Sequence, residues 1–91
     1  MHGNRPIPSR RVIAKESKDS LILLDVESGE YYTLNETGAA VWRLCDGTRD
    51  ADEIALRISE SYEIDIADAL SDVTDILGQL ADESLVSVDL S

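Results

Sequence analysis

The apolar residues of this 91-residue chain change their spacing once, near Asn35. Before that point, apolar and β-branched residues come in short runs, which are typical of strands. After it, apolar residues recur every three or four positions, which is typical of amphipathic helices. A chain of 91 residues has room for one core. The sequence therefore predicts a single α+β domain, with its strands first and its helices second.

Three strands are expected between residues 11 and 34. They are Val12–Ala14, Leu21–Val26 and Tyr31–Leu34. Polar residues at Lys18–Ser20 and Glu27–Glu30 separate them as turns. The second run has apolar residues on both of its faces, which predicts a central strand covered at least partly on each side. An antiparallel meander in this order leaves the third strand at an edge, with backbone groups unpaired on one side.

Three helices are expected in the second part of the chain. The first covers residues 36–45, the second begins after Asp50, and the third covers residues 66–83. Asn35, Asp50 and Asp65 are suitable N-cap residues, and Glu53 completes a capping box with Asp50. The third helix has a wide apolar stripe, formed by Ile66, Ala69, Leu70, Val73, Ile76, Leu77 and Leu80. With Leu85, Val86 and Val88 as a closing strand, the order predicts a winged helix-turn-helix-like fold, a three-stranded antiparallel sheet followed by three helices.

The charge is unevenly distributed along the chain, whose net charge is −11. Five of the eight basic residues lie in residues 1–18, and eighteen of the nineteen acidic residues lie in residues 19–91. An acidic body repels nucleic acid and anionic membranes, and it favours a basic or apolar protein partner. The same charge also keeps a protein soluble, so it does not by itself identify a binding surface.

Residues 1–10 contain both prolines and no apolar period, and we expect them to be a flexible basic tail before a domain over residues 11–90. The start of the chain lacks the apolar run of a secretion signal, and no stretch approaches the roughly 20 apolar residues of a membrane span. The single cysteine excludes a disulfide within the chain and suits a reducing compartment. We therefore expect a cytoplasmic protein, most simply a monomer.

Catalytic and metal-binding patterns are absent from the sequence. Cys45 is the one strong nucleophile, but the only histidine, His2, lies in the expected tail. Cys45 also falls near the C-terminal end of a helix, where the helix dipole disfavours a thiolate. A buried structural cysteine is the favoured interpretation. The sequence shows no phosphate-binding loop, calcium loop or zinc signature, so we expect neither an enzyme nor a cofactor.

Acidic residues recur along the expected third helix. Asp65, Asp68, Asp72 and Asp75 are spaced so that they share one helical face beside the apolar stripe. Favourable charge at the helix N-terminus explains Asp65 and Asp68. It does not explain Asp72 and Asp75, for which a solvated face and a partner-binding surface are both open.

The third strand offers a second possible binding feature. Tyr31 and Tyr32 are adjacent, so their side chains point to opposite faces and only one can enter the core. An exposed edge at Tyr31–Leu34 could accept an extended peptide as an additional strand. A neighbouring groove would then sort the side chains of that peptide.

Residues Gly29–Trp42 and Leu44–Thr48 resemble the PqqD family, named for the pyrroloquinoline quinone biosynthesis protein D. The resemblance covers about residues 11–88, and its most specific parts are Leu34-Asn35-x-Thr37-Gly38 and Cys45-Asp46-Gly47-Thr48. It implies a recognition element for ribosomally synthesised and post-translationally modified peptides (RiPPs). Such an element binds the leader of a precursor peptide as a strand on its third strand, in a groove shared with its third helix. A separate enzyme then acts on the peptide.

Carried onto this chain, the resemblance implies a peptide-binding site on the third strand and the third helix. Its expected residues are Tyr31, Tyr32, Thr33, Leu34, Ala69, Asp72, Val73, Asp75, Ile76 and Leu80. Asp72 and Asp75 would select basic leader residues. The implied partners are the leader peptide and either a leader peptidase with a cyclase, as in lasso-peptide pathways, or a radical S-adenosylmethionine enzyme.

The pattern around Tyr31–Gly38 is closer to the stand-alone recognition proteins of lasso-type pathways. A peptide chaperone in pyrroloquinoline quinone biosynthesis is the alternative within the family. An acidic winged-helix regulator is the alternative from another class, although four acids on the third helix argue against DNA binding.

Overall fold

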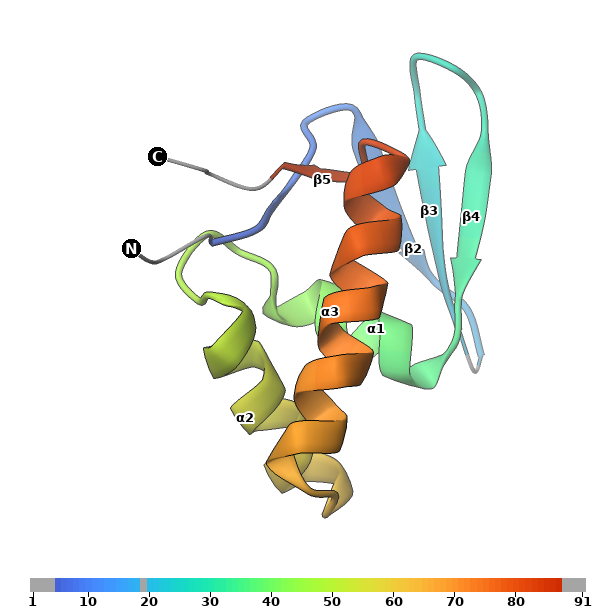
Figure 1. Cartoon of the computed structure of the whole chain (residues 1–91). Coiled ribbons are helices and arrows are strands. Elements are labelled where there is room, and N and C mark those ends of the chain that lie inside the picture. Colours follow the sequence, from blue (N-terminus) through green and yellow to red (C-terminus); the bar gives the residue numbers. More distant parts are fainter. Residues whose placement is uncertain (1–4, 19, 88–91) are drawn as a thin grey trace.

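The computed structural model describes residues 5–18 and 20–87, and its strand-rich half forms the predicted meander (Figure 1). The strands β2 (Val12–Glu16), β3 (Leu21–Asp25) and β4 (Tyr31–Leu34) pair antiparallel in the order β2-β3-β4. In that sheet β3 is central and β4 is an edge, as the sequence predicts. Asp19, in the predicted turn between β2 and β3, lies outside the described residues.

The three predicted helices are present as α1 (Glu36–Leu44), α2 (Ala51–Tyr62) and α3 (Ile66–Asp82). The Asn35 side chain accepts a 2.8 Å hydrogen bond from the Gly38 N–H, which caps α1. The predicted capping box of α2 joins Asp50 and Glu53 through two hydrogen bonds of 2.9 and 3.1 Å. Asp65 is the N-cap of α3 by position, but its side chain makes no capping hydrogen bond.

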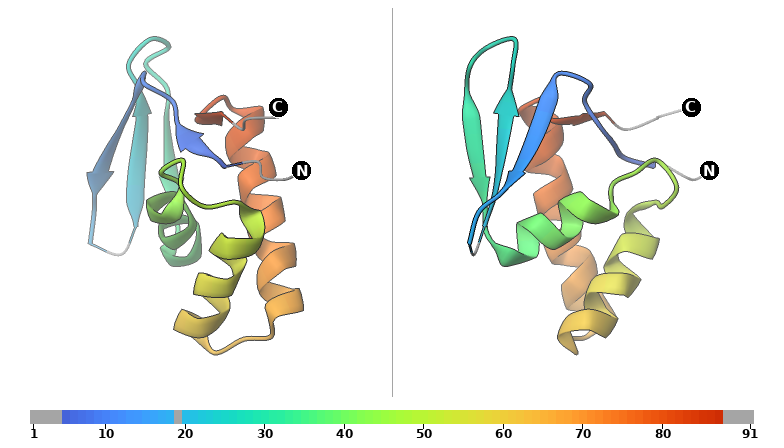
Figure 2. Two further views of the ribbon diagram at one scale, coloured as in Figure 1. Left: turned by 90° about the vertical axis from the view of Figure 1, so that its left-hand side faces the viewer. Right: turned by 180° about the vertical axis from the view of Figure 1, so that it is seen from behind.

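The helices all lie on one side of the three-stranded sheet (Figure 2). Their packing forms two clusters of buried side chains. The first joins α1, α2 and α3 through Val41, Cys45, Ile54, Ala55, Ile58, Ala69, Val73 and Leu77. The second joins the sheet to α1, to the end of α3 and to the segment after it, through Leu21, Leu23, Ala39, Trp42, Leu80, Leu85 and Val86. Because α1 and α3 contribute to both clusters, packing against α2 and against the sheet together fixes the position of these helices relative to β4.

The opposite face of the sheet is not covered by any described element. Leu21 and Leu23 on β3 are buried against the helices, but Leu24 is 37% exposed on the other face. The prediction that β3 is covered on both sides is therefore wrong for this outer face. A continuous apolar run shows that both faces of a strand can be buried, but it does not show that a second layer covers the sheet.

The N-terminal segment does not behave as the predicted tail. Residues Ile7–Pro8 form a short strand, β1, which pairs antiparallel with β5 (Val86–Ser87). The Pro6 carbonyl oxygen accepts a 3.0 Å hydrogen bond from the Gly47 N–H, and Pro6 itself is fully buried. A two-residue strand is too short to show alternation, and proline fits an edge strand because its missing N–H is not required there. Residues 1–4, including His2, and residues 88–91, including Val88, lie outside the described part.

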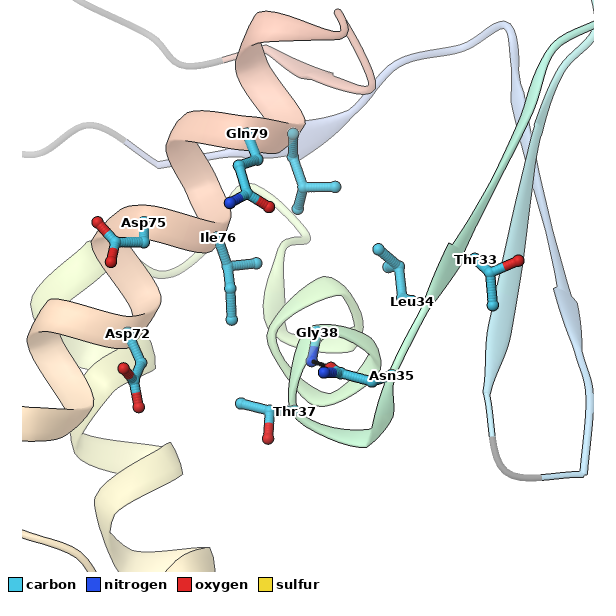
Figure 3. A pocket seen from close by; sticks show the side chains of 10 residues that line it. Thr33, Leu34, Asn35, Thr37, Gly38, Asp72, Asp75, Ile76 and Gln79 are labelled. Atoms are coloured by element: carbon cyan, nitrogen blue, oxygen red, sulfur yellow. Dashed lines mark hydrogen bonds between the residues drawn. The ribbon is translucent and has the colours of Figure 1, made fainter.

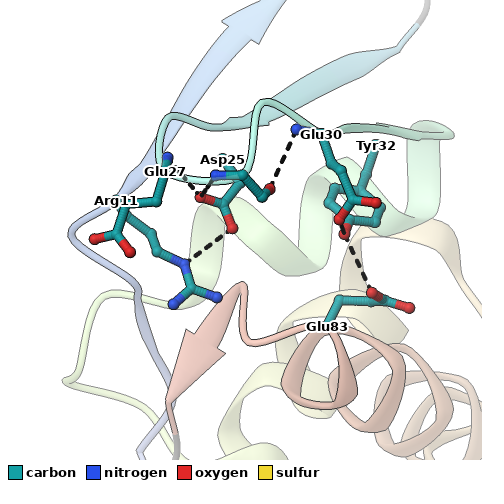
Figure 4. Close-up of polar contacts among 7 residues, drawn as sticks. Arg11, Asp25, Glu27, Glu30, Tyr32 and Glu83 are labelled. Carbon is teal, nitrogen blue, oxygen red and sulfur yellow. Dashed lines mark hydrogen bonds and ion pairs between the residues drawn. The ribbon is translucent and has the colours of Figure 1, made fainter.

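The β3–β4 hairpin is closed around Asp25, which is buried at the end of β3 (Figure 4). Its carboxylate accepts hydrogen bonds from the Glu27 and Ser28 N–H groups and from Arg11, the last at 2.9 Å. Burial of Asp25 raises its pKa, but these hydrogen bonds and the Arg11 charge outweigh burial and hold the pKa below its ordinary value of 3.8. Ionised Asp25 thereby ties the hairpin loop to the segment before β2.

Candidate functional site

The free edge of β4 exposes the backbone groups of alternate residues. The Asp25 N–H donates to the Glu30 carbonyl oxygen at 2.9 Å, so this pair is one of the hydrogen-bonded pairs of the β3–β4 ladder. In an antiparallel ladder, hydrogen-bonded pairs alternate with pairs that are not hydrogen-bonded. The register therefore makes Leu23–Tyr32 and Leu21–Leu34 hydrogen-bonded pairs as well. The N–H and C=O groups of Tyr31 and Thr33 consequently point away from β3, to the open edge.

A groove runs between this edge and α3 (Figure 3). Two adjoining cavities of about 410 and 400 Å³ form it, and they share Thr33, Leu34, Gln79 and Leu80. We call the joined cavities the β4–α3 groove. Its first part is completed by Asn35, Thr37, Gly38, Asp72, Asp75 and Ile76, and its second part by Tyr32, Asp82, Glu83 and Leu85.

Apolar side chains form the floor of the groove. Leu34 points from β4 toward Ile76 on α3, and both pack against the second core cluster (Figure 3). Leu80, a member of that cluster, is only 3% exposed and also lines the groove. Burying a leucine-sized side chain on such a floor stabilises a complex by roughly 1.5–3 kcal/mol. The floor can therefore hold an apolar side chain of an extended peptide.

The start of α1 forms one end of the groove. Leu34, Asn35, Thr37 and Gly38 of the motif that carries the family resemblance all line it. Gly38 lets α1 approach β4 closely: a Cβ atom would lie 3.3 Å from the Asn35 Oδ1 and 3.4 Å from the Leu34 Cβ, so a larger residue would require these neighbours to shift. The motif thus brings β4, the helix cap and the groove wall into close contact.

Tyr32 forms the other end. Its hydroxyl lies 3.2 Å from a Glu30 oxygen and 3.1 Å from a Glu83 oxygen, and its single proton can be donated to one of them at a time (Figure 4). Burial, the hydrogen bond to Glu83 and the charges of both carboxylates raise the pKa of Tyr32 to about 12. The hydroxyl stays protonated at neutral pH and links β4 to Glu83, the C-cap residue of α3.

The groove is acidic. Asp72, Asp75, Asp82 and Glu83 line it, and none of its lining residues is basic. Asp72 and Asp75 project from α3 at the same end as Thr37 (Figure 3). A negative potential along a concave surface favours peptides with lysine or arginine.

Seven of the ten predicted site residues line the groove or its edge as expected: Tyr32, Thr33, Leu34, Asp72, Asp75, Ile76 and Leu80. Tyr31 borders the site through its backbone, but its side chain is 70% exposed on the outer face. Ala69 and Val73 are fully buried in the first core cluster against α2, so their assignment to the groove is wrong. The apolar stripe of α3 is wide because α3 packs on two neighbours, and its spacing does not say which half faces which neighbour.

The sequence interpretation missed seven lining residues: Asn35, Thr37, Gly38, Gln79, Asp82, Glu83 and Leu85. Gln79 follows Asp72 by seven positions and Ile76 by three, so helical spacing already placed it on the same face. Asn35, Thr37 and Gly38 belong to the motif that carries the family resemblance. They line the groove because the start of α1 lies next to the end of β4, and residue spacing does not predict this arrangement.

Cys45 has the surroundings of a structural cysteine. Its thiol donates to the Val41 carbonyl oxygen at 3.2 Å, and the side chain is buried in the first core cluster. Burial and, to a lesser degree, Asp46 raise the pKa of Cys45 to about 12, so a thiolate does not form at neutral pH. Among residues 5–18 and 20–87, no group of His, Cys, Asp and Glu side chains could hold a metal ion. No helix in this part of the chain is both long and apolar enough to cross a bilayer.

Comparison with known proteins identifies the family. Residues 20–86 match the model of coenzyme PQQ synthesis protein D (PqqD). The chain belongs to the PqqD family. No curated protein sequence matches it.

Three solved structures are similar to this PqqD-family chain. TbiB1 in complex with the TbiA(beta) leader peptide is 27% identical, with a TM-score of 0.80 over 89% of this chain and 94% of that one. Lasso peptide synthetase B1 complexed with its leader peptide is 26% identical, with a TM-score of 0.80 over 91% and 98%. The PqqD truncation of Methylobacterium extorquens PqqCD, a stand-alone RiPP recognition element, is 25% identical, with a TM-score of 0.75 over 90% and 87%.

Proposed function

We propose that this chain binds the leader segment of a ribosomally synthesised precursor peptide as an additional strand on β4. The observation that carries the proposal is the open edge at Tyr31 and Thr33 directly beside the β4–α3 groove. Backbone pairing at the edge supplies affinity for any extended peptide, and the groove supplies selectivity for alternate side chains. Two of the similar structures are complexes with leader peptides, which supports the same role here.

The bound leader is then presented to a separate enzyme. A lasso-type pathway, with a leader peptidase and a cyclase, is favoured because lasso peptide synthetase B1 has a higher TM-score than the PqqD structure, 0.80 against 0.75. Delivery of a precursor to a radical S-adenosylmethionine enzyme in coenzyme PQQ synthesis is the second candidate, supported by the family match. In either case the chain acts as a monomeric, non-catalytic adaptor in the cytoplasm. A DNA-binding role is disfavoured because α3 presents Asp72 and Asp75.

A proline scan of the two sheet edges tests strand addition. Thr33→Pro removes an N–H that points to the open edge of β4 and places a ring where the leader strand would lie. Ala14→Pro is the matched control on the opposite edge. The Val26 N–H donates to the Arg11 carbonyl oxygen, so Arg11–Val26 is a hydrogen-bonded pair of the β2–β3 ladder. By alternation along the register, the Ala14 N–H points away from β3, to the open edge of β2. Both changes are compatible with edge strands, so both variants should fold.

Fluorescence anisotropy with a labelled synthetic leader, taken from the precursor encoded beside this chain, gives the readout. Thr33→Pro should weaken binding by about tenfold or more, since the loss of one hydrogen bond corresponds to roughly 1 kcal/mol and steric exclusion adds to it. Ala14→Pro should bind like the unchanged protein. Equal affinities for all three proteins would exclude strand addition at β4.

A further inference from the structure

The outer face of the sheet carries an apolar row that neither the core nor the groove uses. Ile13, Leu24 and Tyr31 lie directly opposite one another on β2, β3 and β4. Their exposed fractions are 55%, 37% and 70%. No described element covers this side of the sheet, whereas all three helices cover the other side (Figure 2).

The charge of this outer face also differs from the rest of the molecule. The next row along the same face is Lys15, Ile22 and Thr33. The two rows together contain one cation and no carboxylate, in a chain with nineteen acidic residues. An exposed apolar surface from which acids are excluded is typical of a protein-binding surface.

A bound leader would enlarge this face. Side chains directly across from one another in a sheet lie on the same face, so the leader residue paired with Tyr31 extends the row Ile13–Leu24–Tyr31 by one position. Leader residues on either side of it point into the β4–α3 groove instead. The groove therefore contacts one set of alternate leader side chains, and the other set is exposed on the outer face of the sheet.

We propose that the outer face, together with the outward side chains of the bound leader, is the docking surface for the enzyme that acts on the precursor peptide. The inference rests on the proposed function. The occupant is a protein with an apolar patch, because the face is apolar and adjoins the strand that the enzyme has to receive. A second copy of the chain is disfavoured, since two bodies of net charge −11 repel each other. The enzyme should bind the leader complex more tightly than the free chain, because the leader adds to the surface.

The double variant Ile13→Lys/Leu24→Lys tests the proposal. Both residues lie on the outer face of β2 and β3, away from the groove and from the open edge of β4. Leu56→Lys is the matched control, because Leu56 on α2 is exposed to a similar degree, 51%, on a different surface. The probe is the purified leader peptidase or modifying enzyme encoded with the precursor, added to each variant with and without synthetic leader.

We expect the double variant to bind leader with unchanged affinity and to bind the enzyme at least about tenfold more weakly, while Leu56→Lys retains both. If the double variant binds leader and enzyme normally, or if Leu56→Lys alone loses the enzyme, the docking surface lies elsewhere. A dimer of the unchanged protein in sedimentation that is lost in the double variant would assign the face to a second copy and overturn the proposal. Absence of leader binding by the unchanged protein would instead refute the proposed function, so the two failures are distinguishable.

Discussion

Asp72 and Asp75 show at the scale of single residues that aspartates on one helical face can have different surroundings. Both carboxylates line the β4–α3 groove beside an apolar floor, and no basic residue there neutralises them. Asp68, one turn earlier on α3, is exposed and does not line the groove. The acidic stripe seen in the sequence therefore consists of two parts, and only its C-terminal part belongs to the candidate site.

Neutralising the groove acids should weaken binding of a leader that contains lysine or arginine. We expect Asp72→Asn/Asp75→Asn to lower affinity by roughly three- to tenfold at low salt, since two partly screened ion pairs are lost. The difference should largely disappear at high salt. Asp68→Asn/Glu60→Gln changes the net charge equally at exposed positions outside the groove and should have little effect in the same titration calorimetry. A loss that is independent of salt, or equal in the control variant, would remove the electrostatic explanation.

At the scale of elements, the position of β4 depends on the hairpin that Asp25 closes. Because the pKa of Asp25 is lower in the folded protein than its ordinary 3.8, the ionised carboxylate stabilises the folded state. This contribution is fully present above the ordinary pKa and is lost as the pH falls through the lower, folded-state value. Asp25→Asn keeps an acceptor for the loop N–H groups but removes the charge that faces Arg11.

We expect Asp25→Asn to lower the thermal midpoint by several degrees at pH 7 and to approach the unchanged protein as the pH falls through the lowered pKa of Asp25. Glu16→Gln is the control, because it removes an ion pair with Arg43 whose side chains are 67% and 51% exposed. Such exposed pairs contribute little, so the control should change the midpoint only slightly. Thermal unfolding followed by circular dichroism across this pH range gives the comparison. A constant difference at every pH would show that the charge of Asp25 is not the cause.

The elements themselves could be predicted from the sequence because their signals are local. The caps at Asn35 and Asp50, the period of α3 and the edge position of β4 all follow from residue spacing. Residue spacing could not predict which element packs against each apolar face. Val73 and Ile76 belong to one apolar stripe, but only packing decides that Val73 meets α2 while Ile76 borders the groove. The pairing of β1 with β5 joins the two ends of the described chain and leaves no periodic signal in two residues.

At the scale of the whole molecule, the sheet separates two surfaces of different chemistry. One side holds an acidic groove with an apolar floor, and the other presents an uncharged apolar row with a lysine beside it. The open edge of β4 lies between them. A peptide bound along that edge contacts both surfaces at once, which is what an adaptor between a peptide and an enzyme requires.

Amide hydrogen exchange along β4, with and without the leader peptide, tests this account most directly. In the free chain the Tyr32 and Leu34 amides should exchange slowly, because they face β3, and the Tyr31 and Thr33 amides should exchange fast. Saturating leader should slow Tyr31 and Thr33 selectively, while the open edge of β2 at Ala14 stays unprotected. If the leader binds and the Tyr31 and Thr33 amides still exchange fast, the peptide does not add a strand to β4, and the central claim is wrong.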